Sequence, residues 1–270
     1  MNKRPIGVFD SGMGGLTAVR QLQTILPGED LVYFGDTGRV PYGTRSPATI
    51  RQYAEQDIRF LLSRDVKFIL AACGTVSSIL PREYTDGLPV PYVGVVDAAV
   101  EAAAAATRNG RIGVIATPAT IRSRSYEERL HSLLPNAEVF CKSCPMFVPL
   151  VENGYVTPHN PITTAIAQEY LTEIKDQGVD TLILGCTHYP LIAHIIADVM
   201  GPGVTLIDSG RQAALKAQQM LIDLELLSDA AAGSTHYYMS DSPENFAAAV
   251  QLFIGPQGSG EATQIAIENY

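Results

Sequence analysis

Short apolar runs alternate with longer amphipathic stretches along most of the 270-residue chain. The short runs are rich in β-branched and aromatic residues, as strands are, and cover residues 6–9, 30–35, 68–72, 92–96, 112–116, 182–185 and 205–208. Between several of them the apolar residues recur with the period of a helix, in the segments 16–26, 50–63, 96–107 and 162–178. Continuous apolar runs that alternate with helices predict an α/β fold whose parallel strands are buried on both faces.

The chain also repeats itself. PIGVFDSG at 5–12 resembles RIGVIATP at 111–118, and each opens a segment that later reaches an apolar strand ending in a cysteine. The cysteine is Cys73 in the first segment and Cys186 in the second. The two segments are therefore predicted to be structural equivalents.

This repeat predicts the domain organisation. LIDSG at 206–210 echoes VFDSG at 8–12, so the chain is expected to return to its first half there. We predict two similar doubly wound parallel-sheet domains related by pseudo-twofold symmetry, one made of residues 1–97 plus 208–270 and the other of residues 98–207. Because ligands bind beyond the carboxyl ends of such strands, the active site is expected in the cleft between the domains, with a thiol on each side.

Composition and charge exclude several classes of protein. Hydrophobic residues make up 46% of the chain and charged residues 17%, which predicts a packed core. The net charge of -9 excludes a nucleic-acid surface, which needs clustered Lys and Arg. No apolar stretch reaches membrane-spanning length, and the N-terminus resembles a strand rather than a signal peptide. We therefore expect a cytoplasmic protein with no membrane partner, whose four cysteines are reduced thiols.

FDSGMGGLT at 9–17 is predicted to be a strand, a glycine-rich turn and the start of a helix. Its glycines permit close approach of the backbone, and exposed amides in such a turn suit an anion. The spacing fits neither G-x-G-x-x-G nor a Walker A motif, so a nucleotide phosphate is not indicated. The alternative is an ordinary β-to-α turn in which Asp10 or Ser11 caps the helix.

Cys73 and Cys186 are the leading candidates for chemistry. Free cysteine is often simply buried, but each of these two follows an apolar strand and is expected near a helix N-terminus, whose dipole lowers the pKa of a thiol. His188 lies two positions after Cys186 and could hydrogen-bond a thiol or a substrate. A lone histidine is more often structural, yet the matched positions of the two thiols favour a catalytic pair.

The remaining polar motifs carry weaker signals. Cys141 and Cys144 form C-K-S-C, but no helix is evident after them and no second Cys or His pair has zinc-ligand spacing, so we interpret them as structural thiols. No metal site is predicted. In the polar loop PYGTRS, Tyr42 and Gly43 could donate hydrogen bonds to a ligand. The sequence around Glu152 indicates only an exposed acidic residue at the end of a helix.

Together these stretches resemble the glutamate racemases of the aspartate/glutamate racemase superfamily. The resemblance runs from residue 6 to residue 255 in the family order, through the segments IGVFDSGMGGLT, GDTGRVPYGTRS, ACGTVSS, PYVGVVD, IGVIATPATI, CPMFVPLVENG, DTLILGCTHYPLI, LIDSG and YYMSDSPENFAAAVQLFIG.

The resemblance implies a cofactor-independent enzyme that inverts the α-carbon of glutamate and supplies D-glutamate for peptidoglycan. Cys73 and Cys186 match the two thiols that act as opposed acid and base, and the positions that assist them are Asp10, Glu152 and His188. The positions matching substrate-binding residues are Asp10, Ser11, Tyr42, Gly43, Gly74, Thr75, Thr187 and His188. No cofactor is implied, and the sequence leaves open whether the protein is a homodimer.

This chain departs from the family pattern after the first thiol. The family usually has Asn there, whereas this sequence has Gly74. Asp97 likewise stands where Glu is common. We hypothesise that Gly74 is an uncompensated loss of one neutral hydrogen bond to the substrate, worth on the order of 1 kcal/mol. Restoring Asn would then lower the KM for glutamate about fivefold. The competing outcome is that a nearby group already fills the gap, in which case the new side chain would clash and raise the KM.

The sequence alone leaves several other functions open. A cysteine hydrolase built on Cys186, His188 and Asp10 would need one nucleophile and leaves Cys73 without a role. A racemase of aspartate or of hydantoins would use the same two-thiol mechanism on another substrate. A binding-only descendant would fit the missing asparagine but not the retention of both thiols. A pyridoxal enzyme is disfavoured because no Lys, including Lys67 and Lys175, lies in a recognisable site.

Overall fold

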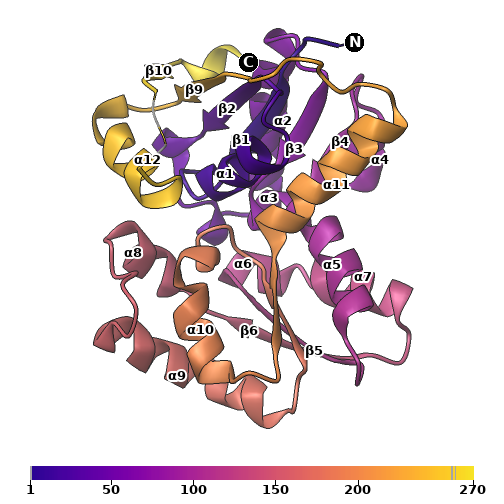
Figure 1. The fold of residues 1–270 in the computed structure, drawn as a ribbon, viewed down its shortest axis with the longest axis vertical. Coiled ribbons are helices and arrows are strands. Elements are labelled where there is room, and N and C mark those ends of the chain that lie inside the picture. Colours follow the sequence, from indigo (N-terminus) through magenta and orange to yellow (C-terminus); the bar gives the residue numbers. More distant parts are fainter. Residues whose placement is uncertain (1, 257, 259) are drawn as a thin grey trace.

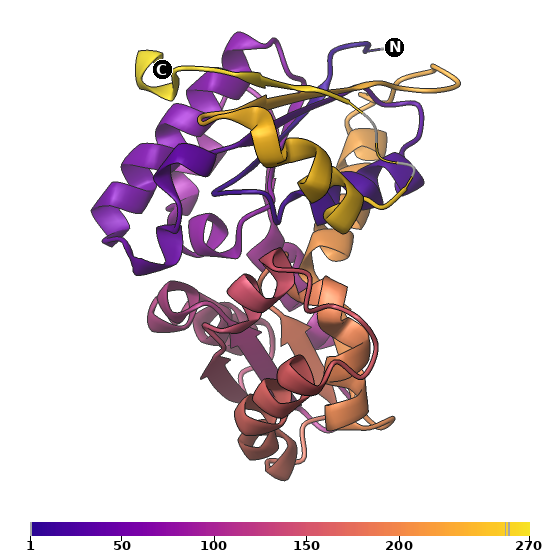
Figure 2. The same cartoon turned by 90° about the vertical axis from the view of Figure 1, so that its left-hand side faces the viewer.

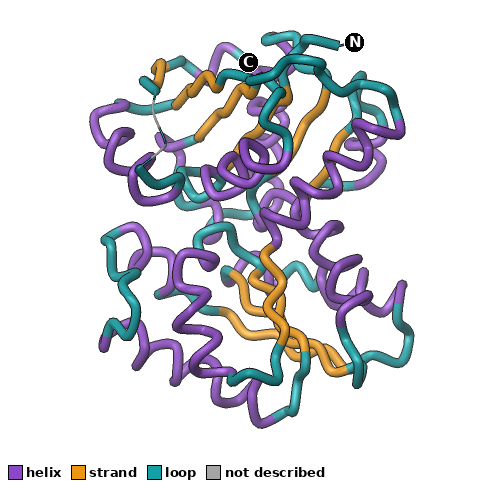
Figure 3. The backbone as a smooth tube through the Cα atoms, in the orientation of Figure 1, coloured by secondary structure: helices purple, strands orange, loops and turns teal. Residues whose placement is uncertain are grey.

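The protein consists of two lobes, each built on its own parallel β-sheet (Figures 1 and 3). The computed structural model describes residues 2–256, 258 and 260–270. In this part of the chain, the first lobe contains a six-stranded sheet of order β10-β9-β2-β1-β3-β4. Its strands are β1 (Ile6–Asp10), β2 (Leu31–Gly35), β3 (Phe68–Ala71), β4 (Tyr92–Gly94), β9 (Thr235–Met239) and β10 (Ala262–Gln264).

The second lobe repeats the strand order of the first. In the described residues its sheet has four strands in the order β6-β5-β7-β8, which corresponds to β2-β1-β3-β4. These strands are β5 (Arg111–Ala116), β6 (Glu138–Ser143), β7 (Thr181–Leu184) and β8 (Thr205–Asp208). Every pairing in both sheets is parallel. The predicted α/β fold with two similar parallel-sheet domains is therefore confirmed.

Helices cover both faces of each sheet (Figures 1 and 2). They are α1 (Leu16–Ile25), α2 (Pro47–Ser63), α3 (Gly74–Ile79), α4 (Arg82–Asp86), α5 (Val95–Ala106), α6 (Pro118–Arg122), α7 (Ser125–Leu133), α8 (Phe147–Glu152), α9 (Pro161–Asp176), α10 (Ala193–Met200), α11 (Ser209–Asp223) and α12 (Phe246–Phe253). No helix in the described ranges is long and apolar enough to cross a membrane.

The chain crosses between the lobes in two helices that pack on each other, α5 and α11 (Figure 1). Helix α11 begins where Asp208 accepts a hydrogen bond from the backbone N–H of Arg211, which satisfies an otherwise free donor of the first turn. The predicted boundary at residue 97 falls inside α5, and the predicted return at residue 208 falls at the end of β8. These limits remain predictions, but the strands they separate lie in different sheets.

The sequence pattern located the buried strands and missed others. Strands β6, β9 and β10 were not predicted, because β6 and β10 lie at sheet edges and none of the three is an uninterrupted apolar run. Residues 95 and 96, expected to end a strand, instead begin α5. The predicted strands at 6–9 and 68–72 correspond to β1 and β3, which are buried throughout. The elements that carry the predicted site were thus located correctly.

Candidate active site

A cavity of about 420 Å³ lies between the lobes, at the carboxyl ends of the strands. All the residues that the sequence predicts for the site line it, namely Asp10, Ser11, Tyr42, Gly43, Cys73, Gly74, Thr75, Glu152, Cys186, Thr187 and His188. The first lobe contributes Asp10 at the end of β1 and Cys73 after β3, and the second contributes Cys186 after β7. The predicted cleft exists, while the role of each residue remains a prediction.

Cys73 is buried at the first-lobe side of this cavity, where it is the N-cap of α3. Its Sγ lies 3.3 Å from Ser11 Oγ. Burial raises the pKa of Cys73 to about 12, and the neighbouring charge of Asp10 adds to the rise, whereas hydrogen bonds from Ser11 and from the backbone of Val76 act in the opposite direction. The expectation that a helix N-terminus lowers this pKa is therefore wrong, because desolvation outweighs the local dipoles. Cys73 is therefore a neutral thiol at neutral pH.

Cys186 belongs to a chain of polar contacts on the second-lobe side. Its Sγ lies 3.6 Å from His188 Nδ1, and His188 Nε2 lies 3.0 Å from Glu152 Oε1. Burial alone would lower the pKa of His188, but the hydrogen bonds to Cys186 and Glu152 outweigh it and raise the pKa to about 10. His188 is therefore an imidazolium at neutral pH. Glu152, whose local sequence gave no signal, is oriented by this histidine.

The glycine-rich turn lets the two sides of the site approach. A β-carbon on Gly14 would lie 2.3 Å from the ring of His188, and one on Gly15 would lie 2.6 Å from the β-carbon of Asp10. The N–H of Gly15 donates to Asp10 Oδ2 over 2.9 Å. Burial raises the pKa of Asp10, while His188 and the N–H groups of this turn hold it down. The motif therefore places Asp10 and His188 together, and Asp10 accepts the N–H of Gly15, the N-cap residue of α1.

Hydroxyl groups from both lobes meet at another wall of the cavity. Thr75 Oγ1 lies 3.1 Å from Thr117 Oγ1, which in turn lies 3.0 Å from Thr120 Oγ1. Thr117 lines the cavity but was not among the predicted site residues. The repeat could have located it, because Thr117 of RIGVIATP occupies the place of Ser11 in PIGVFDSG.

Tyr42 lines the cavity, but its hydroxyl group bonds to residues outside the cavity lining. Its hydroxyl donates to Asp36 and contacts Asp57, and neither carboxyl group lines the cavity. Any donor that Tyr42 offers a ligand is therefore its backbone N–H. The adjacent Gly43 lies in the same short 3-10 turn, Tyr42–Thr44.

The structure contradicts the hypothesis about Gly74. A β-carbon built on Gly74 would lie 2.3 Å from the carbonyl oxygen of Gly185. Real β-carbons do not approach backbone atoms so closely, so the space an asparagine would need is already occupied by the other lobe. Asn at this position is therefore expected to weaken the closed arrangement, and the predicted fall in KM is wrong for this structure.

Cys141 and Cys144 lie apart from the cavity. Cys141 is in β6 and Cys144 directly follows that strand, while α8 begins only at Phe147, so the motif does not open a helix, as the sequence indicated. Burial raises the pKa of both thiols to about 12. Neither lines the cavity. Among the described residues no group of three or more His, Cys, Asp or Glu could hold a metal ion.

Comparison with known proteins agrees with this arrangement. The Asp/Glu/Hydantoin racemase family matches residues 12–217. A glutamate racemase of Geobacter metallireducens is 41% identical over 266 residues, 98% of this chain and 97% of that protein. One of Chlorobaculum tepidum is 44% identical over 257 residues, 94% of this chain and 93% of that protein.

Solved structures agree as well. Glutamate racemase from Francisella tularensis, in complex with D-glutamate, superposes with a TM-score of 0.91 at 39% identity and covers 100% of both chains. A glutamate racemase isoform from Bacillus anthracis superposes with a TM-score of 0.93 at 32% identity, covering 98% of this chain and 99% of that one. Fold and relatives together define an amino-acid racemase, an isomerase. The chain belongs to the Asp/Glu/hydantoin racemase family.

Proposed function

We propose that the protein is a cofactor-independent glutamate racemase that interconverts L- and D-glutamate with Cys73 and Cys186 as opposed acid and base. The observation that carries the proposal is that the two thiols follow equivalent strands, β3 and β7, and line one cavity from opposite lobes. Relatives that carry the name glutamate racemase cover nearly the whole chain. A bound D-glutamate in a related structure supports the choice of substrate.

Two opposed groups satisfy the proton balance of racemisation. A thiolate on one side removes the α-proton, and the electron pair that remains on Cα takes a proton from the thiol on the other side. The first thiolate becomes a thiol and the second thiol a thiolate. The reverse reaction exchanges the roles, so no net proton, electron or leaving group is consumed.

The surroundings of each sulfur fit these roles. His188 is an imidazolium whose Nδ1 lies within hydrogen-bonding reach of the Cys186 sulfur, and Glu152 bonds the other ring nitrogen and so fixes the ring. Cys73, whose pKa is raised by burial, is a neutral thiol suited to act as the acid. A substrate ammonium group beside Cys73 and Asp10 would add positive charge and favour loss of the Cys73 proton when the direction reverses.

The remaining predicted residues would hold the substrate. Ser11, Thr75 and Thr187 present hydroxyl and backbone donors to the cavity, and the turn at Tyr42 and Gly43 presents backbone N–H groups. Donors of this kind suit carboxylates. We further propose that the product D-glutamate supplies peptidoglycan synthesis in the cytoplasm, as the family resemblance implies.

The decisive test follows deuterium into the product. Purified protein without added cofactor is incubated with L-glutamate in D2O under single-turnover conditions, and D-glutamate is analysed by mass spectrometry. We expect one deuterium at Cα, because the returning proton comes from a solvent-exchanged thiol. Unlabelled product would overturn the two-base scheme. Parallel reactions with aspartate and with a hydantoin identify the substrate, and faster turnover of either would overturn the assignment of glutamate.

A further inference from the structure

The wall of the cavity that carries Tyr42 and Gly43 has little regular structure of its own. It belongs to the connection between β2 and α2, which contains two short 3-10 turns, Thr37–Arg39 and Tyr42–Thr44. Val40 within it is 47% exposed. Backbone donors are useful to a substrate only when they are held in place, so this segment needs an anchor outside the cavity.

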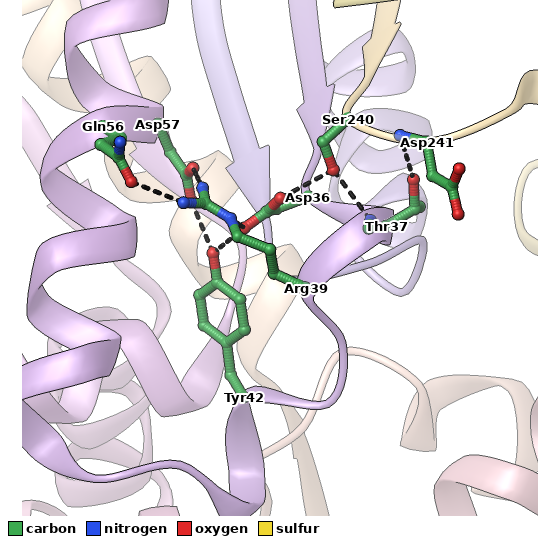
Figure 4. A network of polar contacts seen from close by, with 9 residues as sticks. Asp36, Thr37, Arg39, Tyr42, Gln56, Asp57, Ser240 and Asp241 are labelled. Atoms are coloured by element: carbon green, nitrogen blue, oxygen red, sulfur yellow. Dashed lines mark hydrogen bonds and ion pairs between the residues drawn. The ribbon is translucent and has the colours of Figure 1, made fainter. Parts of the chain in front are cut away.

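A buried polar cluster behind this wall supplies the anchor for the segment (Figure 4). The Arg39 guanidinium donates from Nε to Asp36 Oδ2 over 2.6 Å and from Nη2 to Asp57 Oδ1 over 3.0 Å. The Tyr42 hydroxyl donates to Asp36 Oδ2 and lies 3.2 Å from Asp57 Oδ2. We call Asp36, Arg39, Tyr42 and Asp57 the carboxyl cluster. Only Tyr42 among its members lines the cavity.

The carboxyl cluster joins three segments that are distant in sequence (Figure 4). Asp36 follows β2, and Asp57 lies in α2. Ser240, which follows β9, donates its hydroxyl to Asp36 Oδ1 over 2.7 Å and accepts the N–H of Gly38 over 2.8 Å. The wall of the cavity is therefore tied to the helix behind it and to the C-terminal part of the first lobe.

Charge balance limits the proton positions in the carboxyl cluster. The side chains of Asp36 and Asp57 are both fully buried, and Arg39 is the cation bonded to both. The Tyr42 hydroxyl lies within hydrogen-bonding distance of both carboxyl groups, but it has a single proton and can donate to only one of them at a time. Burial, with the charge of Asp36, raises the pKa of Asp57 well above its usual range. With Tyr42 donating to Asp36, a proton on Asp57 would supply the donor for the second contact and leave one carboxylate for the single guanidinium of Arg39.

We propose that Asp57 is a positioning residue of the racemase reaction: in its protonated form it fixes the hydroxyl of Tyr42 and thereby holds the Tyr42–Gly43 backbone at the geometry that binds the substrate carboxylate. This inference rests on the proposed function of the cavity. It assigns Asp57 an effect on substrate binding although its side chain does not touch the substrate.

The test compares Asp57→Asn, Asp57→Ala and Tyr42→Phe with the wild type. Asparagine keeps a neutral donor beside Tyr42, so Asp57→Asn should keep KM and kcat within about threefold of the wild type. Asp57→Ala and Tyr42→Phe each remove the link and should raise KM about tenfold, the effect of losing a hydrogen bond to a charged group. Their kcat should change less. Tyr42→Phe deletes one oxygen, so it keeps the test usable if Asp57→Ala does not fold.

A matched control separates positioning from stability. Glu29 and Lys67 form another buried ion pair in the same lobe, 2.6 Å apart and outside the cavity lining. Glu29→Gln should lower the melting temperature and leave KM unchanged. If Asp57→Ala and Tyr42→Phe behave like this control, the carboxyl cluster is only structural and the proposal fails. It also fails if Asp57→Asn is as impaired as Asp57→Ala. The substrate is whichever amino acid the wild type racemises fastest, so an error in the choice of glutamate leaves this test intact.

Discussion

Gly74 lies against the carbonyl oxygen of Gly185, so closely that a β-carbon at position 74 would be 2.3 Å from that oxygen. These two glycines are the immediate neighbours of the candidate thiols, Cys73 and Cys186. A close contact between the lobes therefore lies directly beside both catalytic candidates. A side chain at position 74 must therefore displace backbone that adjoins one of the two thiols.

This contact predicts the effect of enlarging Gly74. Overpacking a fixed contact costs about 1–3 kcal/mol, and about 1.4 kcal/mol corresponds to tenfold in rate or affinity. We expect Gly74→Ala to lower kcat/KM about tenfold or more, and Gly74→Asn to lower it further. Steady-state kinetics in both directions measures the change.

The control for this prediction is Gly203→Ala, because a β-carbon at Gly203 would have no neighbour within 4 Å. Its kcat/KM should match that of the wild type. A lower KM for Gly74→Asn would instead mean that the lobes separate readily and that an asparagine contact with substrate is gained.

Removing either candidate thiol should stop racemisation. Cys73→Ala leaves Cα without a proton donor or acceptor on the first-lobe side, and Cys186→Ala does the same on the second-lobe side. General acid–base groups contribute about 10²–10⁴-fold, so each variant should lose at least about 10²-fold in kcat. Cys141→Ala should retain wild-type kinetics, because Cys141 lies outside the cavity. Substantial turnover by either single variant would assign the chemistry to other groups.

The charge of His188 predicts the alkaline limit of activity. Its pKa is raised to about 10, so the hydrogen bond from its imidazolium to Cys186 is present below that pH and is lost as the pH rises through it. We expect kcat/KM to fall above pH about 10. The fall should be equal in both directions, because the two enantiomers have equal free energy in water. His188→Asn should lower kcat/KM and remove this limb from the profile.

Glu152 should shift the same limb. Its hydrogen bond is one of the causes that raise the pKa of His188, so Glu152→Gln should lower that pKa. The alkaline limb of kcat/KM should then move to lower pH, while activity well below the limb changes less. The profile is measured with the wild type in parallel. An unmoved limb would show that the histidine titrates independently of Glu152.

Helix α9 offers a stability prediction that is separate from the chemistry. Asn160 caps it by accepting hydrogen bonds from the N–H groups of Ile162 and Thr163. Asn160→Ala should reduce the free energy of unfolding by about 1 kcal/mol, which lowers the melting temperature by about 2–4 °C for a protein of this size. Because Asn160 lies outside the cavity, kcat/KM should not change.

The sequence by itself determined the fold class and the candidates for chemistry. Strands buried on both faces must be continuously apolar, so β1, β3, β5 and β7 were readable as runs of apolar residues. The repeat then predicted that Cys73 and Cys186 follow equivalent strands. The edge strand β6 could not be predicted in this way, because half-exposed strands carry polar residues and lose the continuous apolar pattern.

Tertiary structure alone decided how these residues act on one another. The contact of Glu152 with His188 joins positions 36 residues apart, and no local pattern encodes it. The pKa of Cys73 rises because burial outweighs the dipole expected at a helix N-terminus, and the extent of burial depends on the packing of both lobes. The sequence likewise leaves two outcomes open at Gly74, and only the tertiary structure favours a clash, because the atom that fills the missing side-chain space, the carbonyl oxygen of Gly185, comes from the other lobe.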